Sequence, residues 1–226
     1  MKILVIITGN WGLDILLAPH IQILSDRMKE LSPEHTVEYA GISCYDDFHN
    51  YENIIQFTYK KRIDKKIPTR DNLTRLTDFI ETYRSDLEYD WFIRIRPEVE
   101  LLEPIQFETL CMDSMNARAR VYYGKKRIPY GKSVGGNGMW SGIDDCFWSD
   151  EEEKTILDDH VLIFHTKHLD ALMSYNPFEF HDIHGQHEWM HNTFYDRINI
   201  KKNVIGINMI FRRKEGDFAY SGNIHC

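Results

Sequence analysis

Continuous apolar runs and helically spaced apolar positions alternate through the first hundred residues. The run Lys2–Thr8 is rich in β-branched residues and lacks polar alternation, which is typical of a strand buried on both faces. Apolar residues at helical spacing occupy 14–31, and Pro33 ends that pattern. Further strands are predicted at 35–43, 53–59 and 90–95, and a further helix at 71–87 with Asp71 as its N-cap. This alternation predicts an α/β fold with a Rossmann-like, mostly parallel central sheet flanked by helices.

The second half of the chain is less regular. Strands are predicted at 119–123, 161–165 and 204–212, and helices at 168–175 and 185–197. Between them, 125–149 is rich in glycine and aromatic residues, which is typical of a long functional loop. Neither an internal repeat nor a linker is visible in the pattern. We therefore expect one domain over 1–226, with a parallel core and a mixed C-terminal extension.

Composition narrows the function classes. A hydrophobic content of 42% favours an ordered globular protein, and the formal net charge of -8 argues against nucleic acid as a partner. No apolar run approaches the roughly 20 residues of a membrane span, so no span is expected. The four cysteines are scattered, which fits reduced thiols and a cytoplasmic location. They are Cys44, Cys111, Cys146 and Cys226.

The strand predicted at 90–95 runs into a group of charged residues. If the chain stays extended, Arg94, Arg96, Glu98 and Glu100 share one face, because side chains alternate along a strand. Two guanidiniums and two carboxylates at a strand end suit a site for phosphate and a divalent metal. The alternative is a ladder of salt bridges. The location favours binding, since open α/β sheets bind ligands at the carboxyl ends of their strands.

The stretch YDWFIRIRPE, which begins at Tyr89, resembles the YDW-hydrophobic-R-x-R-P-D stretch of small nucleotide-sugar glycosyltransferases of the GT-A fold, viral and bacterial ones included. The resemblance implies a nucleotide-binding half at 1–105 and an acceptor-binding half at 106–226. It also implies transfer of a sugar from a nucleotide-diphosphate donor, with UDP-sugar favoured, to a glycan, glycoprotein or glycolipid. For a viral protein the compartment would be the host cytoplasm.

The same resemblance implies roles for the residues of this stretch. Glu98 and Glu100 would bind Mn2+ or Mg2+ in the place of a DxD motif, with glutamates where aspartates are usual. Arg94 and Arg96 would be diphosphate or structural partners.

Two other segments match the positions where such enzymes contact the donor. Thr8, Gly9, Asn10 and Trp11 directly follow the first predicted strand, and the alternative there is an ordinary turn between strand and helix. Asn72 and Arg75 lie on the helix before the charged strand, where the alternative is a solvated helix face.

Asp158 and Asp159 are the candidates for a catalytic base. They precede the predicted strand at 161–165 and resemble the acidic pair before a late strand of these enzymes. An inverting enzyme needs a carboxylate that deprotonates the acceptor hydroxyl, whereas a retaining enzyme does not. The alternative is a turn at the start of the strand, since aspartate is common in turns.

A competing motif lies at 187–191. His187, Glu188 and His191 match HExxH, which on a helix places two imidazoles one turn apart for zinc, with the glutamate as base. It predicts a zinc-dependent hydrolase as the alternative enzyme class. Under the transferase interpretation, His184, His187 or Glu188 would instead approach the metal or the sugar. A third possibility is a non-catalytic module that binds a nucleotide-sugar.

Overall fold

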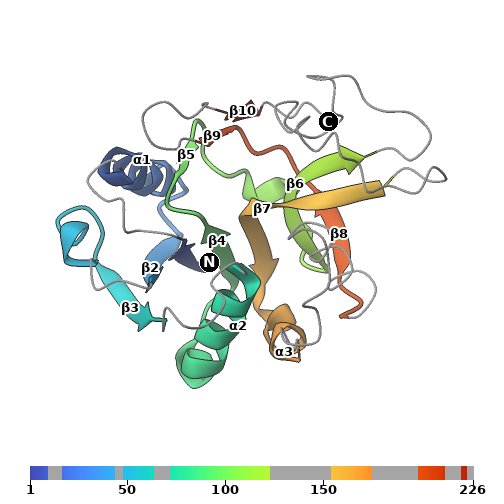
Figure 1. The fold of residues 1–226 in the computed structure, drawn as a ribbon, viewed down its shortest axis with the longest axis horizontal. Helices are drawn as coiled ribbons and strands as arrows, with labels where there is room; N and C mark the ends of the chain where they lie inside the picture. The colour runs from blue at the N-terminus through green and yellow to red at the C-terminus, as the bar shows by residue number, and fades with distance from the viewer. Residues whose placement is uncertain are drawn as a thin grey trace.

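A seven-stranded mixed sheet forms the centre of the protein, with strands in the order β3-β2-β1-β4-β7-β6-β8 (Figure 1). The computed structural model describes residues 1–9, 17–43, 48–63, 72–122, 154–174, 198–211 and 220–222. The sheet takes strands from both the predicted nucleotide-binding half and the predicted acceptor-binding half. The α/β prediction is confirmed, and the sheet is mostly parallel.

The first four strands of this sheet run parallel to one another. They are β1 (Lys2–Thr8), β2 (Thr36–Ser43), β3 (Phe57–Arg62) and β4 (Trp91–Ile95). β1 lies between β2 and β4 and pairs with both, from Lys2 to Thr8 with β2 and from Ile3 to Ile7 with β4. The buried, uninterrupted apolar sequence of β1 follows from this central position, since both of its faces are covered.

The remaining strands of the large sheet come from the second half of the chain. β7 (Lys154–His165) is antiparallel to β4 and to β6 (Ser114–Tyr122), and β8 (Lys201–Val204) is parallel to β6. A second, three-stranded antiparallel sheet places β9 between β5 and β10. Its strands are β5 (Val99–Leu101), β9 (Met209–Phe211) and β10 (Tyr220–Gly222).

Helices cover both faces of the large sheet, with α1 on one side and α2 and α3 on the other (Figure 1). Their bounds are α1 (Ala18–Lys29), α2 (Asn72–Tyr83) and α3 (Leu169–Met173). Short 3-10 helices lie at Phe48–Asn50, Arg84–Asp86, Phe107–Thr109 and Thr166–His168. Alternate β1 residues divide between the two cores: Val5 packs on the α1 side and Ile6 on the α2 side.

Several predicted boundaries are wrong, because contacts with distant segments decide where a helix or strand begins and ends. α1 covers Ala18–Lys29, and residues 14–16 of the predicted helix lie outside the described residues. α2 ends at Tyr83, where a 3-10 helix follows. β3 begins at Phe57 rather than at residue 53, since the preceding segment forms a hydrogen-bonded turn. The strand predicted at 204–212 is two strands, β8 and β9, because it leaves β6 and then joins β5 in the other sheet. The predicted loop at 125–149 and helix at 185–197 lie outside the described residues.

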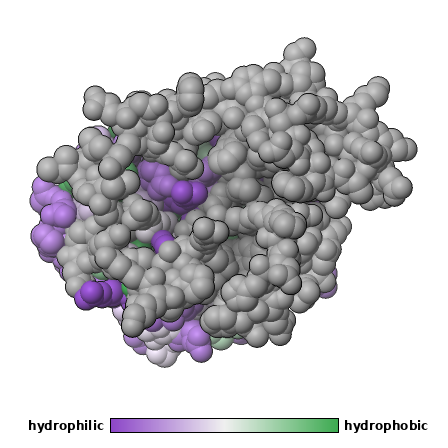
Figure 2. All heavy atoms as spheres, in the orientation of Figure 1, coloured by the Kyte–Doolittle hydropathy of each residue, from purple (hydrophilic) through white to green (hydrophobic). Residues whose placement is uncertain are grey.

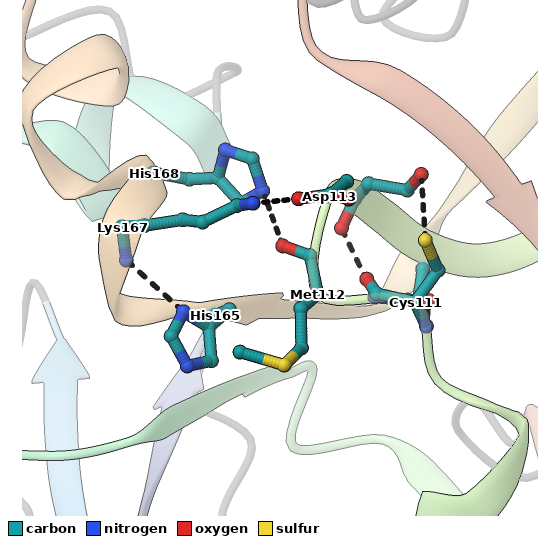
Figure 3. A network of polar contacts seen from close by, with 8 residues as sticks. Cys111, Met112, Asp113, His165, Lys167 and His168 are labelled. Atoms are coloured by element: carbon teal, nitrogen blue, oxygen red, sulfur yellow. Dashed lines mark hydrogen bonds and ion pairs between the residues drawn. The ribbon is translucent and has the colours of Figure 1, made fainter.

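The turn before β6 is tied to the end of β7, at the edge of the sheet where β4 begins (Figure 3). The ring Nε2 of His168 lies 2.9 Å from the carbonyl oxygen of Met112. Lys167 forms an ion pair with Asp113 in the same turn. Burial lowers the pKa of His168, and the contact with Met112 opposes that effect. These contacts join the 3-10 helix Thr166–His168, which directly precedes α3, to the turn before β6.

Two further predictions concern the whole chain. Across the described ranges, the structure has no helix of the length and apolarity that a membrane span requires. Cys111, the one cysteine within those ranges, is a free thiol, and its sulfur accepts a hydrogen bond from the Ser114 hydroxyl at 3.4 Å.

Candidate functional site

The sheet reverses its strand order between β1 and β4. From β1 the chain continues to β2 and β3 on one side, and it returns through α2 to β4 on the other side. In open α/β sheets, ligands bind in the crevice outside the carboxyl ends of the strands at such a switch point. Thr8 ends β1 there and Gly9 follows it, and Ile95 ends β4. The residues just beyond these two strand ends therefore define the candidate site.

Gly9 is in tight contact with the segment that follows β4. A Cβ built on Gly9 would lie 2.5 Å from Cδ of Pro97, 3.0 Å from its Cγ and 3.5 Å from Oε2 of Glu98. The backbone approaches so closely that only a residue without a side chain fits. The structure thus brings the Glu98 carboxylate next to Gly9, the residue that follows β1.

Arg75 contacts the same glycine through its backbone carbonyl. Its Nη1 donates a buried hydrogen bond to the carbonyl oxygen of Gly9 at 2.9 Å, and the residue is only 7% exposed. Arg75 lies near the start of α2, whose Leu76, Phe79 and Ile80 are buried in the core on that face. Gly9 is therefore held between α2 and the Pro97–Glu98 turn.

The two oxygens of the Glu98 carboxylate differ in their surroundings. Oε1 accepts from Arg96, with Nε at 2.8 Å and Nη2 at 2.5 Å. Oε2 is buried and has no hydrogen-bond partner among the described residues, and the same holds for Oγ1 of Thr8. A buried carboxylate oxygen calls for a donor or a cation, because burying an unsatisfied polar group is costly. This atom is the feature of the site that points most directly to a ligand.

Arg94, Arg96, Glu98 and Glu100 do not share one strand face. β4 ends at Ile95, and Pro97 and Glu98 form a turn closed by a hydrogen bond from the Val99 N–H to the Arg96 carbonyl at 3.1 Å. The extended arrangement is therefore wrong, because the chain turns at the proline and enters the second sheet as β5. Figure 2 shows hydrophilic side chains gathered in a hollow of the surface, in the region where Figure 1 places the β4–β5 connection.

Glu100 lies against a different element from Glu98. Its Oε2 is 3.8 Å from Nε2 of His20, in the first turn of α1. Arg27 also ties α1 to β5, since its Nε donates to the Leu101 carbonyl at 3.3 Å. Within the described ranges, no three His, Cys, Asp or Glu side chains gather closely enough to hold a metal ion. Metal binding by the Glu98 and Glu100 pair stays a prediction, with Glu98 as the better placed of the two.

Arg94 is buried on the α2 face of the sheet, on the same side as Phe92, and is 2% exposed. Among the residues whose burial the structure describes, six histidines and arginines are buried, and no aspartate or glutamate is. They are His20, Arg75, Arg94, Arg118, His160 and His168. Several of these lie near the carboxyl edge, and the backbone carbonyl of His160 accepts from Arg96 N–H at 3.1 Å. Basic groups at this edge favour an anionic ligand.

Asp158 and Asp159 lie within β7, and not ahead of a strand as predicted, because β7 pairs with β6 from Lys154 onward. The register between β6 and β7 shifts at this point, where Ala117 pairs with Leu162 but Ala119 pairs with Leu157. Such bulges occur often beside active sites. The side chains of the two aspartates lie outside the described part, so their role as a base stays a prediction.

Other predicted site residues cannot be placed. Asn10, Trp11, His184, His187, Glu188 and His191 lie outside the described residues, and Asn72 is described only in its backbone at the start of α2. His20, Arg118 and His160 are buried polar residues that sequence reasoning missed. Nothing local marks Arg118 and His160, since their burial depends on how β6 and β7 pack beside β4. For His20, the sequence offers one signal: it shares a face of the predicted helix with apolar residues.

No protein-family model matches the chain, and no curated protein sequence matches it.

Proposed function

We propose that this protein is a Rossmann-like glycosyltransferase of the GT-A type that takes its sugar from a nucleotide-diphosphate donor, with UDP-sugar favoured. One observation carries the proposal. The Glu98 carboxylate, held on one oxygen by Arg96, presents a buried second oxygen beside Gly9 at the switch point between β1 and β4. That is where an open α/β sheet binds a nucleotide.

The arrangement suits a diphosphate better than a neutral ligand. Arg94 and His160 are buried near the same strand ends, and a guanidinium is the best protein partner for phosphate oxygens. These features support a phosphorylated ligand on the α2 side of the edge.

The proposal includes a divalent metal, which one carboxylate of the site would bind together with the donor phosphates. Mg2+ and Mn2+ prefer oxygen ligands, and Mg2+ commonly takes one or two carboxylates together with substrate phosphates. Glu98 would supply such a carboxylate through Oε2, and Arg96 fixes its orientation through Oε1. When bound, the ion would neutralise the charge that develops on the leaving nucleotide diphosphate. Glu100 would have to turn away from His20 to join it.

We assign the binding and deprotonation of the acceptor to the second half of the chain. In an inverting reaction a carboxylate must accept the proton of the attacking acceptor hydroxyl. Asp158 and Asp159 lie on β7, next to β4 in the sheet and close in sequence to Val161, which pairs with Ile95 at the end of β4. We assign the base to this pair, with a glycan, glycoprotein or glycolipid as acceptor.

The test is a thermal-shift screen of UDP-, GDP- and CMP-sugars with and without Mn2+, followed by a donor-hydrolysis assay. A ligand that binds the folded state raises the melting temperature. We expect a UDP-sugar to raise it, more strongly with Mn2+, and Glu98→Gln to remove the Mn2+-dependent part. Glu108→Gln is the matched control, because Glu108 is exposed on the 3-10 helix Phe107–Thr109.

Two results would overturn the proposal. The first is that no nucleotide-sugar is bound or hydrolysed by the wild-type protein in the presence of Mn2+. The second is tight stoichiometric zinc that is lost in His187→Ala, which would establish the hydrolase predicted from HExxH.

A further inference from the structure

Arg75 links a helix to the backbone of the candidate site. Its guanidinium is buried, and Nη1 donates to the Gly9 carbonyl at 2.9 Å. The position of the helix is set by the core, since Leu76 and Phe79 of α2 pack with Leu4 and Ile6 of β1. Because core packing fixes the position of α2, the hydrogen bond from Arg75 also fixes the position of Gly9, the residue after β1.

Gly9 in turn sets the position of the Glu98 turn. Its Cα faces the ring of Pro97 so closely that a Cβ there would be 2.5 Å from Cδ, and 3.5 Å from Oε2 of Glu98. Because Gly9 and Pro97 are in close contact, a displacement of Gly9 toward the turn must also move Pro97 and the Glu98 carboxylate. Gly9 thus connects α2 to Glu98: its carbonyl oxygen binds Arg75 of α2, and its Cα lies against the Pro97–Glu98 turn.

We propose that Arg75 is a positioning residue, which holds the end of β1 and through it the Glu98 carboxylate, and which does not itself bind the donor phosphates. This inference deepens the function proposed above and rests on it for the nucleotide. It differs from the sequence-based role of Arg75 as a donor contact. The two roles predict different patterns of affinity along a series of ligands.

The first arm of the test measures the affinity of uridine, UMP and UDP by titration calorimetry in metal-free buffer. We compare the wild type with Arg75→Met and Arg75→Lys. A positioning role through Glu98 leaves all three affinities unchanged without metal, because Glu98 acts on the nucleotide through the ion. When Mn2+ is added, it lowers the affinity of UDP by about tenfold, the usual cost of losing a partner behind a metal ligand. A phosphate contact predicts a loss that grows from uridine to UDP, and that result would overturn the inference. Arg75→Lys keeps the charge but lacks the planar fork, and it serves if Arg75→Met fails to fold.

The second arm needs no ligand. Amide hydrogen exchange is measured on the peptides that contain Gly9 and Glu98, in the wild type and in the same variants. We expect faster exchange at both places in the Arg75 variants. Arg84→Met is the control, since Arg84 is a partly exposed arginine just after α2 that pairs with Asp170. Local opening at these sites can occur without global unfolding.

The two arms separate the two proposals. If exchange rises at Gly9 and Glu98 but no nucleotide binds to the wild type, the proposed function fails and the positioning role stands. If exchange at Glu98 stays unchanged in both Arg75 variants, the positioning role fails whatever the nucleotide affinity.

Discussion

Gly9 and Pro97 meet at the carboxyl edge of the sheet, and no space separates them for a side chain. A Cβ on Gly9 would lie 2.5 Å from Cδ of Pro97. The two residues belong to different strand ends, β1 and β4, that are neighbours only because β1 pairs with β4 in parallel. Their contact brings the carboxylate of Glu98 to the place where the chain leaves β1.

We predict that Gly9→Ala lowers the free energy of unfolding by about 1–3 kcal/mol, the usual cost of overpacking. The proline ring is fixed to the backbone, so the strain moves the turn and displaces Glu98. We therefore also expect Mn2+-dependent nucleotide binding to fall sharply. Urea unfolding measures the first effect, and nucleotide titration at a temperature where the variant is folded measures the second.

Gly41→Ala is the matched control for that variant. A Cβ there would lie 2.5 Å from Cε1 of Phe48, so the clash is equally severe but lies in β2 against a side-chain ring. We expect destabilisation without loss of nucleotide affinity. Equal loss of affinity in both variants would show that the Gly9 effect is general instability and not displacement of Glu98.

A second prediction separates the two glutamates. Glu98→Gln should weaken Mn2+-dependent binding of UDP by at least about tenfold, since even the loss of a partner behind a metal ligand costs about that much. Glu100→Gln should cost less, because Glu100 lies 3.8 Å from His20 on α1. Calorimetry with and without Mn2+ measures both. A larger loss for Glu100→Gln would reverse the assignment.

A third prediction concerns the hydrogen bond from the Tyr89 hydroxyl to Oε2 of Glu38, at 2.6 Å. The hydrogen bond from Tyr89 is the largest cause that lowers the pKa of Glu38. We expect Tyr89→Phe to lower the free energy of unfolding by about 1–2 kcal/mol. This value is below the full range for a hydrogen bond to a charged group, because the Glu38 carboxylate is partly exposed to solvent. Tyr83→Phe should cost less, since its hydroxyl donates to the neutral carbonyl of Lys60. Urea unfolding at neutral pH compares the two.

The same pair predicts a dependence on pH. The folded state lowers the pKa of Glu38, so its contribution is present above the unfolded value of about 4.3 and is lost as pH falls through the folded value. The difference in stability between the wild type and Tyr89→Phe should therefore shrink in acid. A difference that stays constant below about pH 4 would contradict the assigned cause.

A fourth prediction uses His168, whose pKa is lowered by burial. The unfolded state then binds more protons as pH falls below about 6.5, so stability decreases with falling pH until the folded pKa is reached. His168→Gln keeps a donor near the Met112 carbonyl but cannot titrate. We expect its stability to fall less between about pH 7 and 5 than that of the wild type. His49→Gln, at an exposed histidine, should follow the wild type.

The candidate site could be predicted in part. The charged residues after β4 were identified because a buried strand running into arginines and glutamates is visible in one sequence. Their geometry was not, since Pro97 turns the chain and β5 joins another sheet. Gly9 and Arg75 were each identified, but the hydrogen bond between them depends on where the core places α2.

The sequence by itself determined the strands β1 and β4, the approximate places of α1 and α2, and the α/β class. Long apolar runs must be buried on both faces, and helical periodicity must face a core, so these features follow from local pattern. Only the tertiary structure decided that Glu98 meets Gly9 while Glu100 meets His20, and that β7 runs antiparallel from Lys154. These outcomes depend on contacts between distant segments, whose free energies are set by packing and pairing and not by the residues on either side.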